Sequence, residues 1–465
     1  MAGCPLQQNK KFTRFSKAFP QKTYIRKGNN SFMSDEPQTS ETGSLPLGIH
    51  IVAKPTGPAC NLDCDYCFYL EKHALYGPVE NYRMPDEVLS AFIRSYVEAQ
   101  PTPVVEFVWQ GGEPTLLGLN FFRRVIELQR PHDGRKTITN SLQTNGMLLD
   151  DEWCRFLKNH NFMVGISLDG PGEIHDRYRH DRTGKSKFDA VLRGLKLLQR
   201  HKVEYNVMAS VARETARRPL DVYRFFKDEG VEFIQFTPII ERTPDASARE
   251  LGLSLAVPPS PDGKERNTEV TPWTVIPEEY GDFLIAVYEE WVRHDVGKVF
   301  VMNFEWALNA WIGNPSPVCV HASQCGRSVV LEHNGDLFAC DHYVYPEYRL
   351  GNILVDDLTR MIEKSLRSGF GVNKESALPK WCGKCEVLAA CRGGCPKHRF
   401  METCQSEPGL QYLCAGYKKF FRHIRKYLRV MATLLENGLP PSYVMEAVKG
   451  PLVIDTGQKT NSRQR

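Results

Sequence analysis

The distribution of cysteine is the feature that most restricts what this chain can fold into. Of 14 cysteines in 465 residues, three lie between Cys60 and Cys67, and most of the others lie between Cys319 and Cys414. A secreted disulfide scaffold is a poor explanation, because the chain is long and its first 30 residues contain no apolar segment like that of a secretory signal. Thiols grouped in this way predict bound metal in a reducing compartment, so we expect a cytoplasmic protein.

The overall composition argues against several classes of partner. Hydrophobic residues make up 42% and charged residues 25% of the chain, which is typical of a globular protein with a sizeable core. The 59 basic and 55 acidic residues give a net charge of +4, too even a balance to predict binding to nucleic acid or to a membrane surface. No apolar run reaches the roughly 18 residues that indicate a membrane-spanning helix.

Strand-like and helix-like segments alternate between residues 46 and 300. Short β-branched runs predict strands at 49–53, 104–109, 136–143, 163–168, 204–211 and 232–237. Helical apolar spacing predicts helices at 86–99, 119–130, 150–160, 187–201, 218–229 and 277–294. Parallel strands need crossover helices, so the alternation predicts an α/β fold, a partial (β/α)6 barrel. The Pro-rich stretch 241–276 is interpreted as an insertion, either a surface loop or a lid over the substrate.

The regions on either side of this barrel have different compositions. Residues 1–45 are polar and predict a disordered N-terminal extension. Residues 301–415 hold the second cysteine group with sparse signals for regular structure, so we expect a cysteine-rich domain whose folding depends on bound metal. In the last part, 416–465, an amphipathic helix over 416–436 precedes a loose tail.

The first cysteine group, C-x3-C-x2-C, directly follows the first predicted strand. Three thiolates can hold three irons of a four-iron cube, which leaves the fourth iron open to a substrate or cofactor. A structural zinc site needs a fourth ligand nearby. His73 could serve, but it lies six residues past Cys67 in a segment with helical character. The spacing therefore favours an iron–sulfur cluster, with zinc as the alternative.

This motif, with Tyr66 directly before its third cysteine, resembles that of the radical S-adenosylmethionine (SAM) enzymes. In that family the open iron binds SAM, and reduction cleaves SAM to a 5′-deoxyadenosyl radical that abstracts a hydrogen atom. The family's fold is also a partial barrel of this kind. Further matches follow predicted strands, where α/β barrels carry their chemistry: Gln110-Gly111-Gly112-Glu113-Pro114, Gln143-Thr144-Asn145-Gly146 and Ser167-Leu168-Asp169-Gly170. The resemblance implies that Cys60, Cys64 and Cys67 hold the cluster and that the SAM site includes Tyr66, Gly111, Gly112, Glu113, Ser167, Arg179 and Ile240.

The second cysteine group has the spacing Cys319-x5-Cys325-x14-Cys340, followed by Cys382-x2-Cys385-x5-Cys391-x3-Cys395 and then Cys414. It resembles the SPASM extension of peptide-modifying radical SAM enzymes, which holds two auxiliary four-iron clusters. The family's interleaved ligation implies one cluster on Cys319, Cys325, Cys340 and Cys395. It implies the other on Cys382, Cys385, Cys391 and Cys414, with Cys404 as a less suitable candidate for the last position. Two zinc sites are the alternative.

Within this group the chain resembles the anaerobic sulfatase-maturating enzymes over about residues 47–430, through segments 54–62, 109–115, 166–171 and 340–342. These enzymes oxidise a Cys or Ser of a C/S-x-P-x-R motif in a partner sulfatase to Cα-formylglycine. The resemblance implies SAM, three [4Fe-4S] clusters, an unfolded or nascent sulfatase as substrate, and an electron donor such as ferredoxin or flavodoxin. It also implies that Asp341 is the catalytic base and that Tyr69 lines the peptide site. The plainer alternatives are a turn residue and a packed aromatic.

Two other functions stay open at this point. One is a SPASM maturase that forms a thioether or carbon–carbon crosslink on a precursor peptide, although residues 1–45 are too polar for an added recognition domain. The other is a non-catalytic, zinc-stabilised regulatory protein, in which the strand-end loops and the open three-cysteine site have no use. The sequence does not separate Cys-type from Ser-type sulfatase substrates, and it does not predict the oligomeric state.

Overall fold

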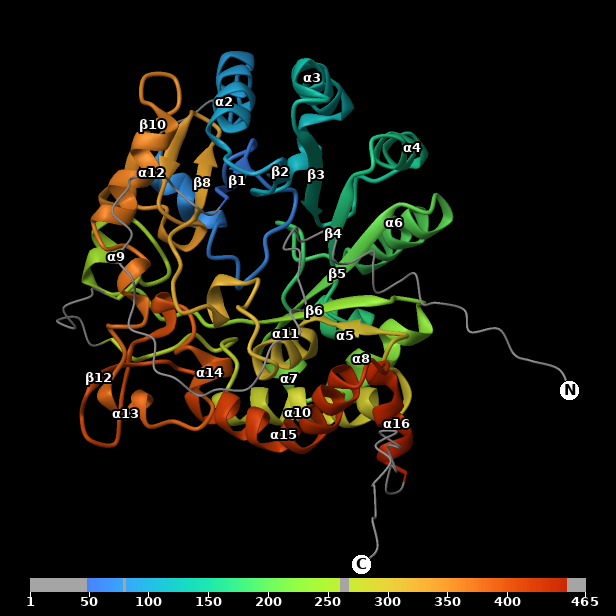
Figure 1. Ribbon diagram of the computed structural model, residues 1–465. Helices are drawn as coiled ribbons and strands as arrows, with labels where there is room; N and C mark the ends of the chain where they lie inside the picture. The colour runs from blue at the N-terminus through green and yellow to red at the C-terminus, as the bar shows by residue number, and fades with distance from the viewer. Residues whose placement is uncertain (1–47, 78–80, 260–266, 450–465) are drawn as a thin grey trace, which may run out of the picture.

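The computed structural model describes residues 48–77, 81–259 and 267–449, so the predicted extension at 1–45 lies outside the described residues. Parallel strands form an arc with helices along its outer side (Figure 1). The six central strands are β1 (His50–Lys54), β2 (Val104–Trp109), β3 (Thr137–Thr144), β4 (Met163–Ser167), β5 (Glu204–Val211) and β6 (Phe233–Pro238). The main helices that follow them are α2 (Asp86–Ala99), α3 (Leu119–Gln129), α4 (Asp151–Asn159), α6 (Phe188–Arg200), α8 (Pro219–Asp228) and α10 (Pro277–His294). The predicted partial barrel is confirmed.

Alternating burial explains how a strand presents one face to the helices and the other to the site. Val105, Phe107 and Trp109 of β2 are fully buried. The rings of Phe107 and Trp109 lie 5.4 Å and 5.9 Å from that of Phe92 in α2, measured between centroids. Successive side chains of a strand point to opposite faces, so the residues between them face the inner side of the arc. Large aromatic side chains therefore fix the outer layer and leave the inner side for polar groups.

The second half of the chain extends the same sheet, which the sequence analysis did not predict. The strand order is β10-β9-β8-β1-β2-β3-β4-β5-β6-β7. β8 pairs in parallel with β1, with His50 opposite Ser328 and Lys54 opposite Glu332. The added strands are β7 (Phe300–Val301), β8 (Ser328–Glu332), β9 (Asp336–Phe338) and β10 (Arg349–Asn352). The expectation of sparse regular structure in this region was wrong for residues 328–352.

The long helix α15 (Cys414–Glu436) closes the lower end of the molecule beside α10 (Figure 1). Its start lies two residues before the predicted 416, which puts Cys414 at the helix N-terminus. Two glycines allow the helices to approach closely. A Cβ on Gly416 would lie 2.0 Å from the carbonyl oxygen of Pro277, and one on Gly281 would lie 2.7 Å from that of Gly416. Any larger side chain at either position would force the helices apart.

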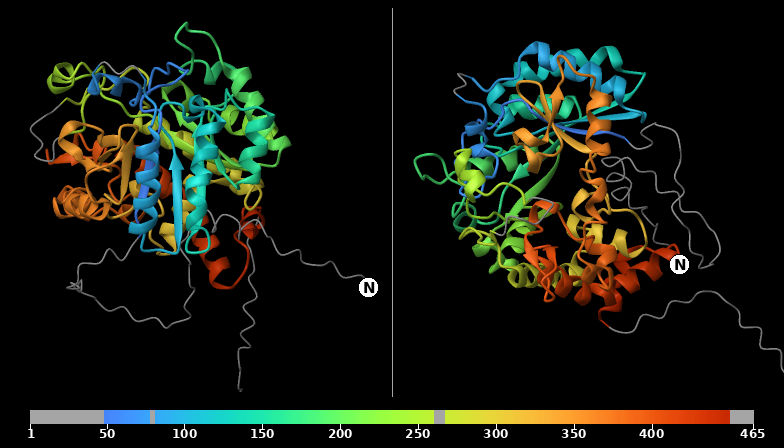
Figure 2. Two further views of the ribbon diagram at one scale, coloured as in Figure 1. Left: turned by 90° about the horizontal axis from the view of Figure 1, so that it is seen from above. Right: turned by 90° about the vertical axis from the view of Figure 1, so that its left-hand side faces the viewer.

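The remaining elements are short and connect or cover the larger ones. The helices are α5 (Gly172–His175), α7 (Arg213–Ala216), α9 (Ala246–Glu250), α11 (Met302–Trp311), α12 (Leu358–Arg367), α13 (Lys380–Gly383), α14 (Leu388–Cys391) and α16 (Val444–Ala447). A separate hairpin consists of β11 (Met401–Glu402) and β12 (Pro408–Leu410). Viewed from the side, the orange segments of the second half lie between the blue start of the barrel and the red α15 (Figure 2).

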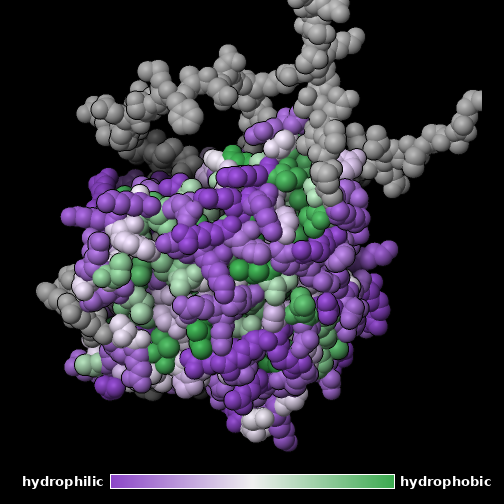
Figure 3. Space-filling model, turned by 90° about the horizontal axis from the view of Figure 1, so that it is seen from below, coloured by the Kyte–Doolittle hydropathy of each residue, from purple (hydrophilic) through white to green (hydrophobic). Residues whose placement is uncertain are grey.

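The described parts of the insertion 241–276 pack against the rest of the protein. Arg242 and Val270 form an isolated β-bridge, and the Thr243 N–H donates to the carbonyl of Glu269 at 3.0 Å. The lower face of the molecule is mostly hydrophilic, with small separate apolar areas (Figure 3). Within the described ranges, no helix combines the length and apolar character needed to cross a membrane.

Candidate functional site

The first cysteine loop begins six residues after β1 and is fixed by backbone bonds to a distant segment. For example, the Asp63 N–H donates to the carbonyl of His180 at 2.8 Å. Burial raises the pKa of the Cys60 thiol to about 12, and it also raises the pKa values of Cys64 and Cys67. A thiolate in this environment needs a nearby positive charge. Iron supplies that charge, so this set of donors fits an iron–sulfur cluster.

The Gly-Gly turn after β2 packs directly against the segment that leads to the first cysteine. The Gly112 N–H donates to the carbonyl of Gly57 at 2.8 Å, and the Glu113 N–H donates to that of Ala59 at 2.8 Å. A Cβ on Gly112 would lie 1.9 Å from the Ala59 carbonyl oxygen, and Gly111 has a φ of +141°. These glycines are therefore required by a close approach of two backbone segments.

Glu113 connects this turn to the next strand end. Its carboxylate accepts bonds from the Thr115 N–H and hydroxyl at 3.0 and 2.6 Å, from the Thr144 hydroxyl at 2.7 Å, and from the Asn145 N–H at 2.7 Å. The side chain of Asn145 in turn donates to that of Asn61 at 2.8 Å, beside the first cysteine. Burial raises the pKa of Glu113, and the hydrogen bonds oppose this rise. Glu113 thus positions the loops around the SAM site that the resemblance predicts.

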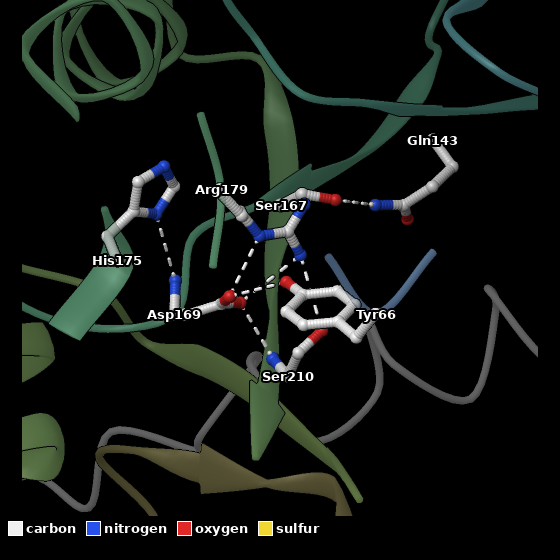
Figure 4. Close-up of polar contacts among 7 residues, drawn as sticks. All are labelled: Tyr66, Gln143, Ser167, Asp169, His175, Arg179 and Ser210. Atoms are coloured by element: carbon white, nitrogen blue, oxygen red, sulfur yellow. Dashed lines mark hydrogen bonds and ion pairs between the residues drawn. The ribbon is translucent and has the colours of Figure 1, made fainter. Parts of the chain in front are cut away.

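Asp169, at the end of β4, is the centre of a buried polar network (Figure 4). Its carboxylate accepts bonds from the Tyr66 hydroxyl at 2.6 Å, from Arg179 Nε and Nη2 at 2.8 and 3.2 Å, and from the Ser210 N–H at 2.8 Å. The Arg179 guanidinium also lies 5.4 Å from the centre of the Tyr66 ring. Burial alone would raise the pKa of Asp169, but Arg179 outweighs it and the net pKa is lowered. Two predicted site residues, Tyr66 and Arg179, are thereby held together.

The other two predicted SAM-site residues lie nearby in different surroundings. The Ser167 hydroxyl accepts a bond from Gln143 Nε2 at 3.0 Å and stays partly exposed (Figure 4). Ile240 is buried in the main core. Its neighbour Ile239 packs on the small cluster formed by Tyr66, Tyr178 and Ala212. Ile239 is therefore a second candidate for the apolar side of the SAM site, and the role of Ile240 stays a prediction.

Asp341 lies where the two halves of the molecule meet. Lys54 Nζ, at the end of β1, is 2.6 Å from Asp341 Oδ1 and 3.3 Å from the side-chain oxygen of Gln110. The same ammonium lies 4.3 Å from the centre of the Tyr69 ring, and the Tyr69 hydroxyl donates to Glu332. Burial alone would raise the pKa of Asp341, but the charge of Lys54 outweighs it and the net pKa is lowered. An ionised carboxylate at this position can accept a proton.

The eight cysteines of the second group fall into two sets in space. Electrostatic interactions connect the thiols of Cys319, Cys325, Cys340 and Cys395. They likewise connect those of Cys382, Cys385, Cys391 and Cys414. These are the two sets that the resemblance predicts, although the assignment as cluster ligands stays a prediction. Cys404 is exposed and belongs to neither set.

Two buried cations hold the loops that carry these cysteines, and the sequence analysis missed both. Lys374 Nζ donates to the carbonyl oxygens of Cys319, Val320 and Ala322 at 2.6, 3.0 and 2.5 Å. Arg399 donates to the carbonyls of Gly393 and Lys374 at 2.8 and 2.6 Å, and its charge acts on thiols of both sets. The sequence contains no local signal for Lys374, because its partners lie 52 to 55 residues away, whereas Arg399 bonds mainly to the nearby turn 392–394.

Lys54 was missed as well, but the sequence does contain a signal for it. A lysine at the end of an apolar strand is unusual, and barrel strands end at the site. Within the described residues, no three His, Cys, Asp or Glu side chains converge as they would around a single metal ion.

Comparisons with known proteins agree with this geometry. Residues 55–226 match the family model of the radical SAM superfamily, and residues 319–386 match that of an iron–sulfur cluster-binding domain. A serine-type anaerobic sulfatase-maturating enzyme of Bacteroides thetaiotaomicron is 43% identical over 88% of this chain and 97% of its own length. A cysteine-type enzyme of Clostridium perfringens is 33% identical over 81% of this chain and 96% of its own.

A solved structure shows the same architecture. The structure of native anSMEcpe with bound AdoMet and the Cp18Cys peptide superimposes with a TM-score of 0.71 and 31% identity, over 83% of this chain and 99% of that one. Sequence, fold and the arrangement of the cysteines thus agree. The chain belongs to the anaerobic sulfatase-maturating enzymes of the radical SAM superfamily.

Proposed function

We propose that this protein oxidises a Cys or Ser residue in a C/S-x-P-x-R motif of a sulfatase to Cα-formylglycine. The observation that carries the proposal is the position of Asp341. Its carboxylate follows Cys340 of the second cysteine group and is paired at 2.6 Å with Lys54, which ends the strand that leads to the first cysteine loop. Family membership supplies the reaction class, and this carboxylate supplies the acceptor that the reaction needs.

The proposal assigns two groups of residues to the cofactors. Cys60, Cys64 and Cys67 would hold the first cluster, and SAM bound there would supply the radical chemistry that removes a Cβ hydrogen atom from the substrate. Around SAM we place Tyr66, Gly111, Gly112, Ser167, Arg179 and Ile240, with Glu113 as support. The cysteines at 319, 325, 340 and 395 and those at 382, 385, 391 and 414 hold the two auxiliary clusters.

Asp341 acts as the base in this scheme. Oxidation of a CH₂OH or CH₂SH group to an aldehyde or thioaldehyde removes one hydrogen atom, one proton and one electron, and a fully ligated cluster on the second cysteine group would accept the electron. Water would then convert a thioaldehyde to the aldehyde with loss of H₂S. Asp341 takes the proton from the hydroxyl or thiol, and Lys54 keeps the carboxylate ionised and oriented before the proton arrives. Tyr69 lies beside both and forms part of the wall of the peptide site.

Serine is the substrate residue that the comparisons favour. The serine-type relative described above is 43% identical to this chain, and the cysteine-type relative is 33% identical. The sulfatase must present this motif in an unfolded segment, because the target side chain has to reach the interior between the two halves of the enzyme. A low-potential electron carrier such as ferredoxin or flavodoxin would supply the separate electron that reduces the first cluster before SAM is cleaved. The 13 described cysteines form no disulfide, which supports a cytoplasmic location.

We place the functional boundaries at 46–300 for the barrel with its insertion 241–276, at 301–415 for the auxiliary-cluster domain, and at 416–465 for the C-terminal helix and tail. The shared sheet means that the first two units are not independent in structure. The boundary near 300 therefore separates functions rather than folding units.

The test is mass spectrometry of two peptides, one with S-x-P-x-R and one with C-x-P-x-R, after anaerobic incubation with cluster-loaded protein, SAM and reductant. We expect formylglycine from the serine peptide and release of 5′-deoxyadenosine. Release of 5′-deoxyadenosine with both peptides unchanged would contradict the sulfatase assignment and leave the crosslinking alternative. Conversion of the cysteine peptide alone would overturn the serine preference.

A further inference from the structure

Lys72 is a fully buried lysine that the proposed chemistry does not use. It lies in the single-turn segment η1 (Leu70–Leu75) that follows the first cysteine loop, and it is 1% exposed. Its Nζ lies 3.6 Å from the centre of the Tyr345 ring. Among the described residues, this Nζ has no hydrogen-bond acceptor. A buried ammonium with three donors and no acceptor is a feature that requires an explanation.

The carboxylates around Lys72 are already engaged elsewhere. Its charge interacts with those of Glu71, Glu241 and Asp341. Glu241 pairs with Lys397 at 2.7 Å, and Asp341 pairs with Lys54 at 2.6 Å. One oxygen of Glu71 accepts bonds from the Ser254 N–H and hydroxyl and from the Leu255 N–H, at 2.7 to 3.0 Å. Glu71 is therefore the one of these three carboxylates without a cation paired to it among the described residues, and Lys72 Nζ forms no hydrogen bond with it.

Two neighbouring tyrosines relate Lys72 to Asp341, the proposed base. Tyr345 lies four residues past Asp341, and Tyr69, three residues before Lys72, lies against the Lys54–Asp341 pair. The second carboxylate oxygen of Glu71 is also buried without a hydrogen-bond donor among the described residues. A cationic donor and an anionic acceptor thus stand on consecutive residues beside the proposed base. A peptide group, which offers one C=O and one N–H, is complementary to this pair.

We propose that Lys72 is a substrate-binding residue that donates a hydrogen bond to a backbone carbonyl oxygen of the bound sulfatase peptide. The inference rests on the proposed function and adds to it a contact that recognises the peptide main chain near the target residue. Glu71, held by the insertion through Ser254 and Leu255, accepts a bond from a peptide N–H. The insertion 241–276 thereby supports the wall of the peptide site.

The melting temperature of a Lys72 variant distinguishes this binding role from a purely structural one. Burying an ammonium without a hydrogen-bond partner costs free energy, and burial lowers the pKa of Lys72 to about 8. A methionine of similar length would keep the packing on Tyr345 and remove that cost. Lys72→Met should therefore melt no lower than the wild type. A lysine that served only to support the fold would show a lower melting temperature when replaced.

The experiment measures binding of a fluorescein-labelled S-x-P-x-R peptide to cluster-loaded protein with SAM, by fluorescence anisotropy. The peptide contains no Asp or Glu and has an amidated C-terminus, so that backbone carbonyls are its main acceptors. Lys72→Met should weaken peptide binding by about 10-fold to 100-fold, the range for a hydrogen bond to a charged group. SAM affinity and melting temperature should not fall. Lys158→Met, on an exposed position of α4, is the matched control and should bind like the wild type.

Three outcomes would overturn the inference. Unchanged peptide affinity in Lys72→Met would mean that the lysine meets only water or a small anion. A lower melting temperature with parallel losses of SAM and peptide binding would make Lys72 a structural residue. A wild-type protein that binds no peptide would overturn the proposed function together with this inference, whereas wild-type binding with an unaffected variant overturns the inference alone.

Discussion

Asp169 and Asp341 each pair with a cation, yet their surroundings differ. The Asp169 side chain is 3% exposed, and it accepts hydrogen bonds from the Tyr66 hydroxyl and the Ser210 N–H in addition to two from Arg179. The Asp341 side chain is 27% exposed, and Lys54 is its one ion-pair partner within the described residues. A carboxylate surrounded by donors can only hold its neighbours in place. Asp341, which has a single partner, can still accept a proton from a bound substrate. We therefore call the network around Asp169 the fixed half of the site and the region around Asp341 its proposed reactive half.

Replacement of Asp341 should have the largest effect on activity. Asp341→Asn keeps the shape of the side chain and removes the base, so we expect formylglycine formation to fall by about 10²-fold to 10⁴-fold. Iron content and release of 5′-deoxyadenosine should persist. Both are measured in the peptide assay described above. Asp336→Asn, which loosens an exposed pair with Arg349 in the same half, is the control. Wild-type turnover in Asp341→Asn would remove its assignment as base.

Replacement of Arg179 should have the largest effect on stability. Arg179→Met leaves the buried Asp169 without its cation, a change that destabilises proteins by about 3–5 kcal/mol. The free energy of unfolding in urea measures this loss. Arg200→Met removes an exposed pair with Asp151, with side chains 61% and 52% exposed, and should change stability by less than about 1 kcal/mol. Equal stability of the two variants would contradict the view of Asp169 as a closed, fixed network.

Substitution of Gly112, in the turn after β2, should have a smaller effect that is confined to the fixed half of the site. In Gly112→Ala the new Cβ meets the Ala59 carbonyl oxygen, and overpacking of this kind costs about 1–3 kcal/mol. Because the displaced segment leads into the first cysteine loop, we expect weaker SAM binding in equilibrium dialysis. Gly383→Ala is a matched control within a cysteine loop, since nothing lies within 4 Å of its added Cβ. Undiminished SAM affinity in Gly112→Ala would show that the turn can move without harm.

A pH effect of His175 is the smallest of the four. Burial lowers the pKa of this histidine to about 4, while the unfolded chain titrates near 6.5. Between these values the unfolded state binds a proton that the folded state does not, so stability falls as pH decreases, by up to about 1.4 kcal/mol per pH unit. His175→Gln should reduce this slope between pH 6.5 and 4 in urea unfolding. An exposed histidine, His73, gives the control His73→Gln. Identical slopes in all three proteins would exclude the effect.

Local patterns in the sequence predicted the fold of the barrel well. Each predicted strand lies within one or two residues of an observed one, because apolar β-branched runs and helical spacing are properties of short segments. The cysteine motif and the strand-end loops gave candidate site residues for the same reason; the structure brings Tyr66 and Arg179 together at Asp169, and their roles stay predictions. The pairing of β8 with β1 was not predicted, since it joins segments far apart in the chain. The same limit applies to Lys374 and Lys72, whose contacts join segments far apart in the chain.

The pairing between β1 and β8 has a consequence for the newly made chain. His50 and Lys54 lie opposite Ser328 and Glu332, so one edge of the first strand stays without its partner until the ribosome has passed residue 332. At roughly 5–20 residues per second, that delay is on the order of 10–60 s. An unpaired strand edge is a template for association with other chains. During synthesis the barrel therefore depends on its own late segment, or on a chaperone, to cover the strand that leads into the cofactor loop.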